Sequence, residues 1–175
     1  MPEGDTIFRA ARTLQRALAG RVVTAFGTQL SSLAVVDRRA PVAGRTIERV
    51  ESRGKHLLVA FSGDLVLRTH LRMHGSWHIY RPGERWRAPR RDACIVVTTA
   101  EWVAIAFNVV DAELLTPSEV ARHARLSALG PDLLAAEPDL AEARTRCGTP
   151  IRSESETGGR RTYWCPACQA APGQR

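Results

Sequence analysis

The sequence predicts an α+β fold, with an N-terminal helix plus an antiparallel β-sandwich, a short linker and a C-terminal zinc-ribbon-like hairpin. Apolar residues recur first at helical spacing, and from residue 21 to about 116 short β-rich runs follow one another between glycine-bearing turns. Three cysteines then cluster near the C-terminus. These changes of pattern divide the chain into residues 1–116, 117–143 and 144–175.

The N-terminal helix is predicted from apolar residues on one helical face, namely Ile7, Phe8, Ala11, Leu14 and Leu18. Asp5 or Thr6 is a suitable N-cap, and Gly20 is a suitable end. Pro2 and Glu3 come immediately before this helix. In structural terms alone they suit a first helical turn, where proline is tolerated and an acidic side chain meets the positive end of the helix.

The sandwich is predicted to contain strands at 22–26, 46–52, 56–61, 65–71, 75–80, 92–98 and 101–110. Turns at Arg53-Gly54-Lys55 and Ser62-Gly63-Asp64 join successive strands, and Thr99-Ala100 closes the last hairpin. Residues 81–91 carry five arginines and two prolines, which predicts an exposed basic loop. A short helix is predicted from Pro117 to about Leu129.

The charge of the chain favours a polyanionic partner. Its net charge is +7 and its isoelectric point about 10.2. Lys55 is the only lysine among 25 cationic residues, and the arginine guanidinium suits bidentate phosphate contacts, although a G+C-rich genome would give the same bias. Because no apolar run reaches the roughly 20 residues of a membrane span and no secretory signal is visible, we expect a cytoplasmic protein without a membrane partner. We also expect the chain to be a monomer.

The cysteines indicate a metal site. Cys94 lies in an apolar run and is expected to be a small buried residue. Cys147, Cys165 and Cys168 cluster as they do in zinc ribbons, in which two Cys-x2-Cys knuckles hold one ion. Arg144 stands where the first cysteine of the first knuckle is expected. Either three thiolates bind zinc with water, a histidine or a partner's cysteine as fourth ligand, or the site is broken.

Three histidines, His70, His74 and His78, are spaced four residues apart. On a strand such residues are separated by about 13 Å, which is too far to share one ion. They are therefore predicted to be ordinary polar positions or neighbours of a phosphate.

Pro2 can also be a nucleophile. If Met1 is removed, Pro2 carries a free secondary amine, and an α-amino group titrates near pH ~8, well below lysine at ~10.4. Its attack on an aldehyde carbon gives an iminium ion, which acts as an electron sink for later eliminations. Glu3 is placed to donate or accept the protons that such a sequence requires.

Five segments in series carry a resemblance: Met1–Thr6, Ser52–Leu57, His70–Trp77, Leu129–Leu134 and Thr162–Gln169. On these motifs the chain resembles the formamidopyrimidine-DNA glycosylase and endonuclease VIII (Fpg/Nei) family, and looks most similar to its actinobacterial endonuclease VIII branch. The resemblance implies a bifunctional DNA glycosylase and abasic-site lyase of base-excision repair. Its partner would be damaged DNA, double- or single-stranded, in the nucleoid.

The resemblance also implies catalytic roles within residues 1–116 and the C-terminal hairpin. Pro2 would attack C1′ of the damaged nucleotide, and Glu3 would protonate the sugar and shuttle protons. Lys55 would bind phosphate and assist β-elimination. Arg160 would grip phosphate and assist δ-elimination.

Further DNA contacts are implied for Met73, His74 and Arg161. Met73 would fill the gap left by a flipped base, as apolar wedges do. His74 and Arg161 would join Lys55 and Arg160 in binding DNA. One zinc ion would be held by Cys147, Cys165 and Cys168.

The chain departs from the family in two respects that leave a second hypothesis open. Only about a dozen residues separate Leu134 from Cys147, so the family's helix–two-turn–helix module is missing, and the segment Phe107–Asp111 lacks the arginines usual there. The alternative is therefore a truncated, catalytically silent DNA-binding remnant. A tautomerase that uses an N-terminal proline on keto acids is a third hypothesis, which the cysteine cluster and the basic loop argue against.

Overall fold

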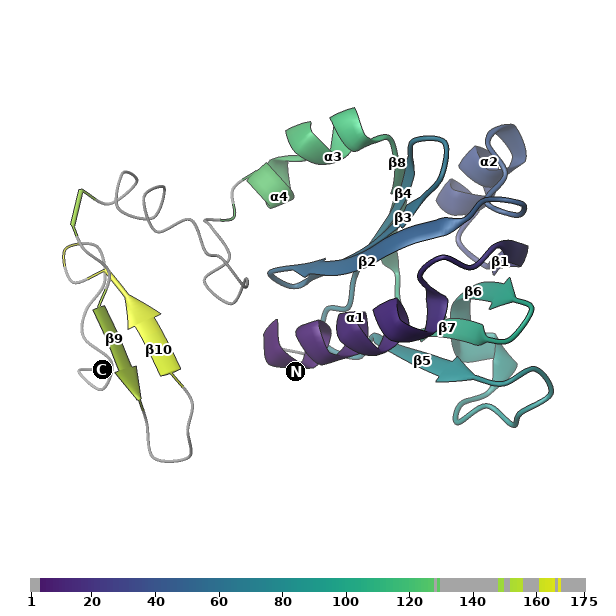
Figure 1. Cartoon of the computed structure of the whole chain (residues 1–175), viewed down its shortest axis with the longest axis horizontal. Helices are drawn as coiled ribbons and strands as arrows, with labels where there is room; N and C mark the ends of the chain where they lie inside the picture. The colour runs from purple at the N-terminus through teal and green to yellow at the C-terminus, as the bar shows by residue number, and fades with distance from the viewer. Residues whose placement is uncertain are drawn as a thin grey trace. The chain divides into compact units, whose positions relative to one another are not determined.

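The computed structural model describes residues 4–127, 129, 148–149, 152–155, 161–165 and 167. The chain divides into two compact units, Met1–Ser127 and Ala128–Arg175. In the second unit, β9 (Arg152–Ser155) pairs antiparallel with β10 (Arg161–Trp164). The first unit holds the helix α1 (Gly4–Leu18) and two β-sheets (Figure 1).

Both sheets of the first unit are antiparallel and four-stranded. One has the order β1-β6-β7-β5, with strands at Val23–Thr28, Ala93–Thr99, Val103–Phe107 and Ser76–Tyr80. The other has the order β2-β3-β4-β8, with strands at Ile47–Arg53, His56–Phe61, Leu65–His70 and Asp111–Leu115. The predicted α+β class, a helix with an antiparallel sandwich, is confirmed.

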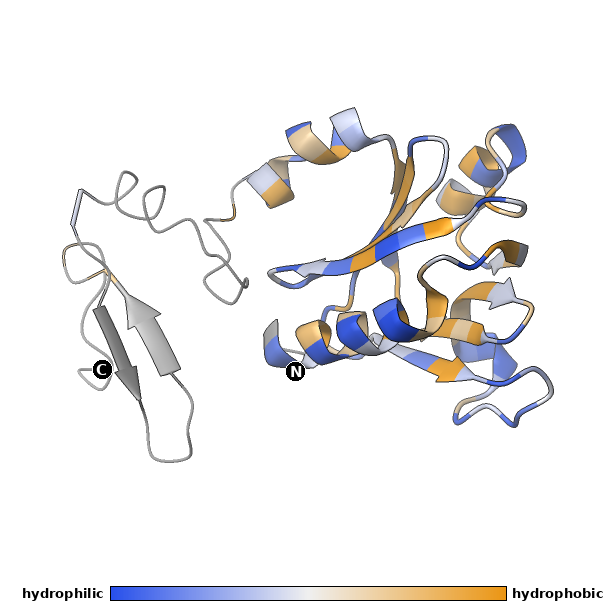
Figure 2. Ribbon diagram, in the orientation of Figure 1, coloured by the Kyte–Doolittle hydropathy of each residue, from blue (hydrophilic) through white to orange (hydrophobic). Residues whose placement is uncertain are grey.

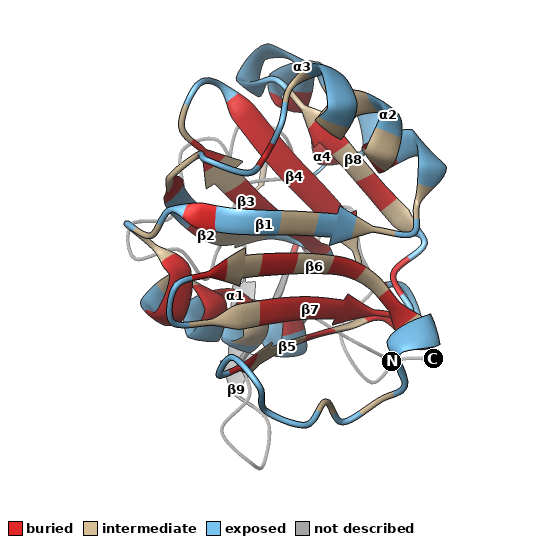
Figure 3. Cartoon of the chain, turned by 90° about the vertical axis from the view of Figure 1, so that its right-hand side faces the viewer, coloured by how far each residue is buried: buried red, intermediate tan, exposed pale blue. Residues whose placement is uncertain are grey.

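The two sheets share one apolar core because alternate side chains of a strand point to the same face. On β6 every second residue is buried, and Ile95 and Val97 pack in the same cluster as Leu57 and Leu67 of the second sheet. Figure 3 shows the buried residues in red along β3, β4, β6 and β7, whereas only the first residue of β1, Val23, is buried. The core therefore lies between the sheets and against α1.

Helix α1 forms where the spacing predicts it. Its apolar face is buried, its opposite face carries exposed arginines, and the two appear as alternating stripes in Figure 2. Gly20, with φ +78°, follows the helix and donates to the Ile47 carbonyl at 2.7 Å, while the Gln15 side chain accepts from the Val50 amide at 2.5 Å. Helix and strand thus run in opposite directions, and Gly4 lies toward the Arg53 end of β2.

One helix is absent from the sequence prediction. α2 (Ser31–Arg39) lies in a region expected to contain only strands and loops. Among its residues only Leu33 is buried, and Val35 and Val36 are β-branched. A helix that buries so little has no clear apolar stripe, so its sequence gives no helical signal.

The strand predicted at 101–110 is too long, and a further strand, which begins at residue 111, is absent from the prediction. β7 ends at Phe107, and Asn108 adopts a left-handed φ of +54°, a conformation that asparagine tolerates better than most residues. Val109 is buried and Val110 exposed, after which β8 begins at Asp111 and pairs with β4 of the other sheet. The chain therefore crosses from one sheet to the other at residues 108–110.

The helix predicted from Pro117 is interrupted. α3 (Pro117–Arg122) begins with a capping box between Thr116 and Glu119, and α4 (Ala124–Ser127) follows after His123, whose ψ of 115° is not helical. Both helices cover the outer face of the second sheet. The residues in contact there are Val120 and Leu126 of the helices and Leu58 and Val66 of the strands.

The loop at 81–91 is exposed at its arginines, as predicted, and ends in a short 3-10 helix, η1 (Arg90–Asp92). Trp86 anchors it by packing with Phe107. Cys94 packs against the core but is only half-buried, and its thiol donates to the Asp92 carbonyl at 3.6 Å, so the prediction of a small buried residue holds only in part.

Candidate nucleic-acid interface

Three connections between strands meet at one end of the sandwich. In the second sheet, Arg53 lies opposite His56, His56 opposite His70, and His70 opposite Asp111. The turn after β2, the turn after β4 and the crossing before β8 therefore lie together. The first residue of α1 is at the same end (Figure 1).

The first connection is the two-residue turn Gly54-Lys55 between β2 and β3. Gly54 has φ +55°, which glycine adopts without steric cost. This tight turn places Lys55 in an exposed position at the tip of the hairpin. A lysine ammonium held there is suitable for contact with a phosphate.

The second connection is the turn of residues 71–75 between β4 and β5. The Gly75 amide donates to the Leu71 carbonyl at 2.8 Å, and a Cβ at Gly75 would lie only 2.5 Å from that oxygen. Arg72 is in the left-handed region at φ +47°. This backbone presents Met73, which is 58% exposed, together with an exposed His74.

The separation of about 13 Å expected for histidines four residues apart applies only along a single strand. His70 lies on β4, His74 in the turn and His78 on β5, so the three do not share one strand. In the described residues no group of three His, Cys, Asp or Glu side chains is arranged to hold a metal. Burial lowers the pKa of His70, whose ring centroid lies 4.7 Å from that of His56.

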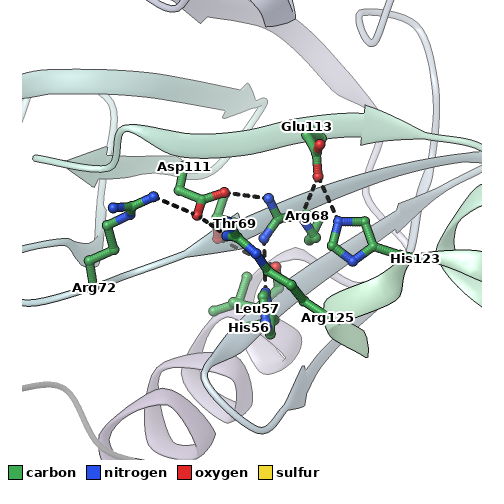
Figure 4. Close-up of polar contacts among 9 residues, drawn as sticks. All are labelled: His56, Leu57, Arg68, Thr69, Arg72, Asp111, Glu113, His123 and Arg125. Atoms are coloured by element: carbon green, nitrogen blue, oxygen red, sulfur yellow. Dashed lines mark hydrogen bonds and ion pairs between the residues drawn. The ribbon is translucent and has the colours of Figure 1, made fainter. Parts of the chain in front are cut away.

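A buried arginine, Arg68, organises the outer face of the second sheet (Figure 4). Its guanidinium pairs with Asp111, donates to Glu113 Oε2 at 2.7 Å and donates to His56 Nδ1 at 2.9 Å. Because arginine can only donate, Nδ1 of His56 accepts, and the neutral ring carries its proton on Nε2. Burial, reinforced by the charge of Arg68, lowers the pKa of His56 to about 4.

Asp111 is the centre of this polar cluster. It accepts from Arg68, from Arg72 at 3.1 Å and from Arg125 at 2.8 Å, and these arginines belong to β4, the 71–75 turn and α4. Burial alone would raise the pKa of Asp111, but the hydrogen bonds and charge of the arginines lower it to about 2. The carboxylate is therefore ionised and joins three separate segments at the end of the sandwich.

Glu113 extends the cluster to the junction of the two short helices. Its Oε2 atom accepts from Arg68 and lies 3.0 Å from Nε2 of His123, the residue between α3 and α4. This contact lies at the point at which the helix predicted from Pro117 is interrupted.

The sequence prediction missed the cluster of Arg68, Asp111, Glu113 and Arg125. Its signal is the alternation of acidic residues at positions 111 and 113. That signal becomes readable only when β8 is recognised as a strand separate from β7.

Of the residues predicted for the site, the structure brings Lys55, Met73 and His74 to the same end of the sandwich. Five others, Pro2, Glu3, Cys147, Arg160 and Cys168, lie outside the described residues. Arg161 is the first residue of β10, and Cys165, directly after that strand, is buried. The roles predicted for all of them stay predictions.

Comparison with protein-family models gives two matches. Residues 1–116 match the formamidopyrimidine-DNA glycosylase N-terminal domain, and residues 145–171 match a zinc finger found in FPG and IleRS. The second match includes all three clustered cysteines. No helix in the described part of the chain is long and apolar enough to cross a membrane.

Curated relatives agree with these matches. A Streptomyces coelicolor protein named "Probable endonuclease 8 2" is 41% identical over 140 residues, which cover 79% of this chain and 49% of that protein. An Escherichia coli "Endonuclease 8" is 34% identical over 140 residues, covering 80% and 51%. The chain thus spans about half the length of the curated relatives it matches.

Solved structures share the fold. Lactococcus lactis Fpg bound to DNA containing N7-benzyl-Fapy-dG superposes with a TM-score of 0.66 at 19% identity, covering 89% of this chain and 58% of that one. A complex of Lactococcus lactis Fpg with DNA containing an abasic site gives a TM-score of 0.66 at 18% identity, covering 89% and 57%.

Proposed function

The chain belongs to the formamidopyrimidine-DNA glycosylase and endonuclease VIII family, and we propose that it is a DNA glycosylase and abasic-site lyase that excises oxidised bases from damaged DNA. The arrangement at one end of the sandwich supports this proposal most strongly. The start of α1, the Lys55 turn and the exposed Met73 lie together there. These are the positions at which a nucleophile, a phosphate contact and a wedge are needed.

The proposed reaction begins with the secondary amine of Pro2. As its nitrogen bonds to C1′, the bond from C1′ to the damaged base breaks, and Glu3 supplies a proton to the sugar oxygen when the ring opens. The resulting iminium draws electrons from the sugar, so loss of a sugar proton expels the 3′ phosphate with assistance from Lys55. A second elimination, assisted by Arg160, expels the 5′ phosphate.

Met73 has the proposed role of wedge. An unbranched apolar side chain that is 58% exposed gains nothing in water, but it can replace a base that has left the stack. The tight 71–75 turn, which depends on Gly75, presents it in a fixed position.

We propose that the C-terminal hairpin binds one zinc ion through Cys147, Cys165 and Cys168. Thiolates are the ligands that structural zinc prefers, and zinc in such sites is four-coordinate, so a set of three cysteines leaves one position for water or another donor. Cys165 is buried directly after β10, which suits a structural ligand. Bound zinc would add its binding free energy to the stability of this small hairpin.

Borohydride trapping tests the proposal. The protein is mixed with an oligonucleotide that contains an abasic site, and borohydride reduces any iminium to a stable amine link. We expect a covalent complex for the wild-type chain and none for Pro2→Gly or for a variant that retains Met1. Failure of the wild-type chain to form a complex would refute the enzymatic proposal.

A second candidate is a DNA-binding remnant without catalysis, which is favoured by one observation: the chain spans about half the length of its curated relatives. It predicts DNA binding with a steep salt dependence, since phosphate contacts release counterions. It also predicts neither trapping nor strand nicking, so the same experiment separates the two candidates.

A further inference from the structure

Two exposed arginines from different segments meet on a single oxygen atom. Arg72 of the 71–75 turn donates from Nη2 to Asp111 Oδ2 at 3.1 Å, and Arg125 of α4 donates from Nη1 to the same oxygen at 2.8 Å. The two nitrogens are therefore no farther apart than the sum of these distances. Figure 4 shows both guanidinium groups converging on Asp111.

The carboxylate lies beneath the two guanidinium groups. The Asp111 side chain is 10% exposed, whereas Arg72 and Arg125 are 56% and 61% exposed. The other oxygen of Asp111 is engaged by the buried Arg68, which also pairs with Glu113. Three guanidinium groups facing two carboxylates leave the cluster with an excess of positive charge.

Each exposed arginine keeps donors for a ligand. A guanidinium group has five N–H donors in a planar fork. In the described part of the chain, Arg72 and Arg125 each donate one hydrogen bond, in both cases to Asp111. Two guanidinium groups that both donate to one carboxylate can also donate together to a second anion through their remaining N–H groups. A phosphate oxygen accepts from arginine in the same geometry as a carboxylate oxygen.

We propose that Arg72 and Arg125 together bind one phosphodiester of a nucleic-acid strand, with Asp111 as the residue that positions them. The position of the pair favours a strand over a small anion, because Met73 follows Arg72 directly and the Lys55 turn lies at the same end of the sandwich. This inference deepens the proposed function by assigning a backbone contact beside the wedge.

Binding of a lesion-free duplex, measured by fluorescence anisotropy over a series of salt concentrations, tests the pair. Arg72→Gln and Arg125→Gln should each weaken binding. The double variant should lower the slope of log K against log salt by about 0.9, the value for one phosphate contact. Since both arginines hold the same phosphate, the loss in the double variant should be smaller than the product of the two single losses.

Arg49→Gln is a matched control, because Arg49 is 60% exposed and pairs with Glu51, but lies within β2. We expect it to leave the salt slope unchanged. An equal loss in Arg49→Gln and the test variants would overturn the proposal, as would an unchanged slope in the double variant.

Asp111→Asn separates positioning from simple charge. Removing a negative charge from a DNA-binding surface strengthens binding if only the net charge matters. If Asp111 positions the two arginines, Asp111→Asn instead weakens binding. Glu113→Gln removes the same charge from Arg68 without touching Arg72 or Arg125, and should bind at least as tightly as the wild type.

Thermal unfolding followed by circular dichroism confirms that each variant is folded at the temperature of the assay. Tighter binding by both Asp111→Asn and Glu113→Gln would overturn the proposal. Trapping by the wild type with no effect of the arginine variants would refute this inference and leave the enzyme proposal standing. Arginine-dependent binding without trapping would do the reverse.

Discussion

Acidification should weaken the fold through His56. In the folded chain this ring accepts a hydrogen bond from Arg68 and has a pKa of about 4, against 6.5 for an unperturbed histidine. Besides burial, the charges of Arg68, His70 and His123 lower this pKa, and only Asp111 raises it. The unfolded chain therefore binds a proton at a pH at which the folded chain does not. The contribution of His56 to the free energy of unfolding is therefore complete above about pH 6.5 and is lost as the pH falls toward 4.

The size of the effect follows from these two pKa values. Between pH 7 and pH 5, a shift from 6.5 to about 4 removes about 2 kcal/mol from the free energy of unfolding. Stabilities of single domains are about 5 to 15 kcal/mol, so this loss is large enough to measure.

Urea unfolding at a series of pH values measures the loss, with His56→Asn as the comparison. Asparagine does not titrate in this range, and its side-chain oxygen can accept the hydrogen bond from Arg68. We expect the wild type to lose about 2 kcal/mol more than His56→Asn between pH 7 and pH 5. Equal losses in the two proteins would refute the assignment of a neutral, buried His56.

Three further predictions concern single residues. Met73→Ala should change the free energy of unfolding by less than about 0.5 kcal/mol, because the side chain is exposed. The same variant should slow base excision from duplex DNA but leave trapping on a single-stranded abasic oligonucleotide unchanged. Loss of both activities together would argue against a wedge. Gly75→Ala should lower the free energy of unfolding, measured in urea, by about 1 to 3 kcal/mol, because the new Cβ would lie 2.5 Å from the Leu71 carbonyl oxygen. An unchanged unfolding midpoint would contradict the described turn. Arg144→Cys should raise the affinity for zinc in competition with a chelator by completing a four-cysteine set, whereas an unchanged affinity would show that the cysteines do not form one site.

The parts of the fold that the sequence predicts are those with a strong local pattern. α1 has a continuous apolar stripe, and the hairpin of β2 and β3 has alternating strands around Gly54-Lys55, so both can be identified without tertiary information. α2 buries only Leu33 and gives no such pattern. The end of β7 depends on the backbone conformation of Asn108, which composition does not reveal.

The residues of the candidate site also differ in whether the sequence alone identifies them. As an apolar residue, Met73 would be assigned to the core from residue type alone. Only the resemblance to a family implies an exposed position, and in the structure the side chain is exposed. The hydrogen bonds from Arg68 to Asp111 and Glu113 join residues that are 43 and 45 positions apart, so the cluster depends on the register between β4 and β8. That register cannot be predicted without first separating β8 from β7.

The proposed reaction requires the N-terminal nitrogen of the chain as its nucleophile. The most direct measurement is mass spectrometry of the protein after borohydride reduction with abasic DNA and digestion with a protease and a nuclease. We expect the sugar remnant on the peptide that begins with Pro2. A remnant on Lys55, or an N-terminal peptide that still begins with Met1 and carries no adduct, would contradict the claim.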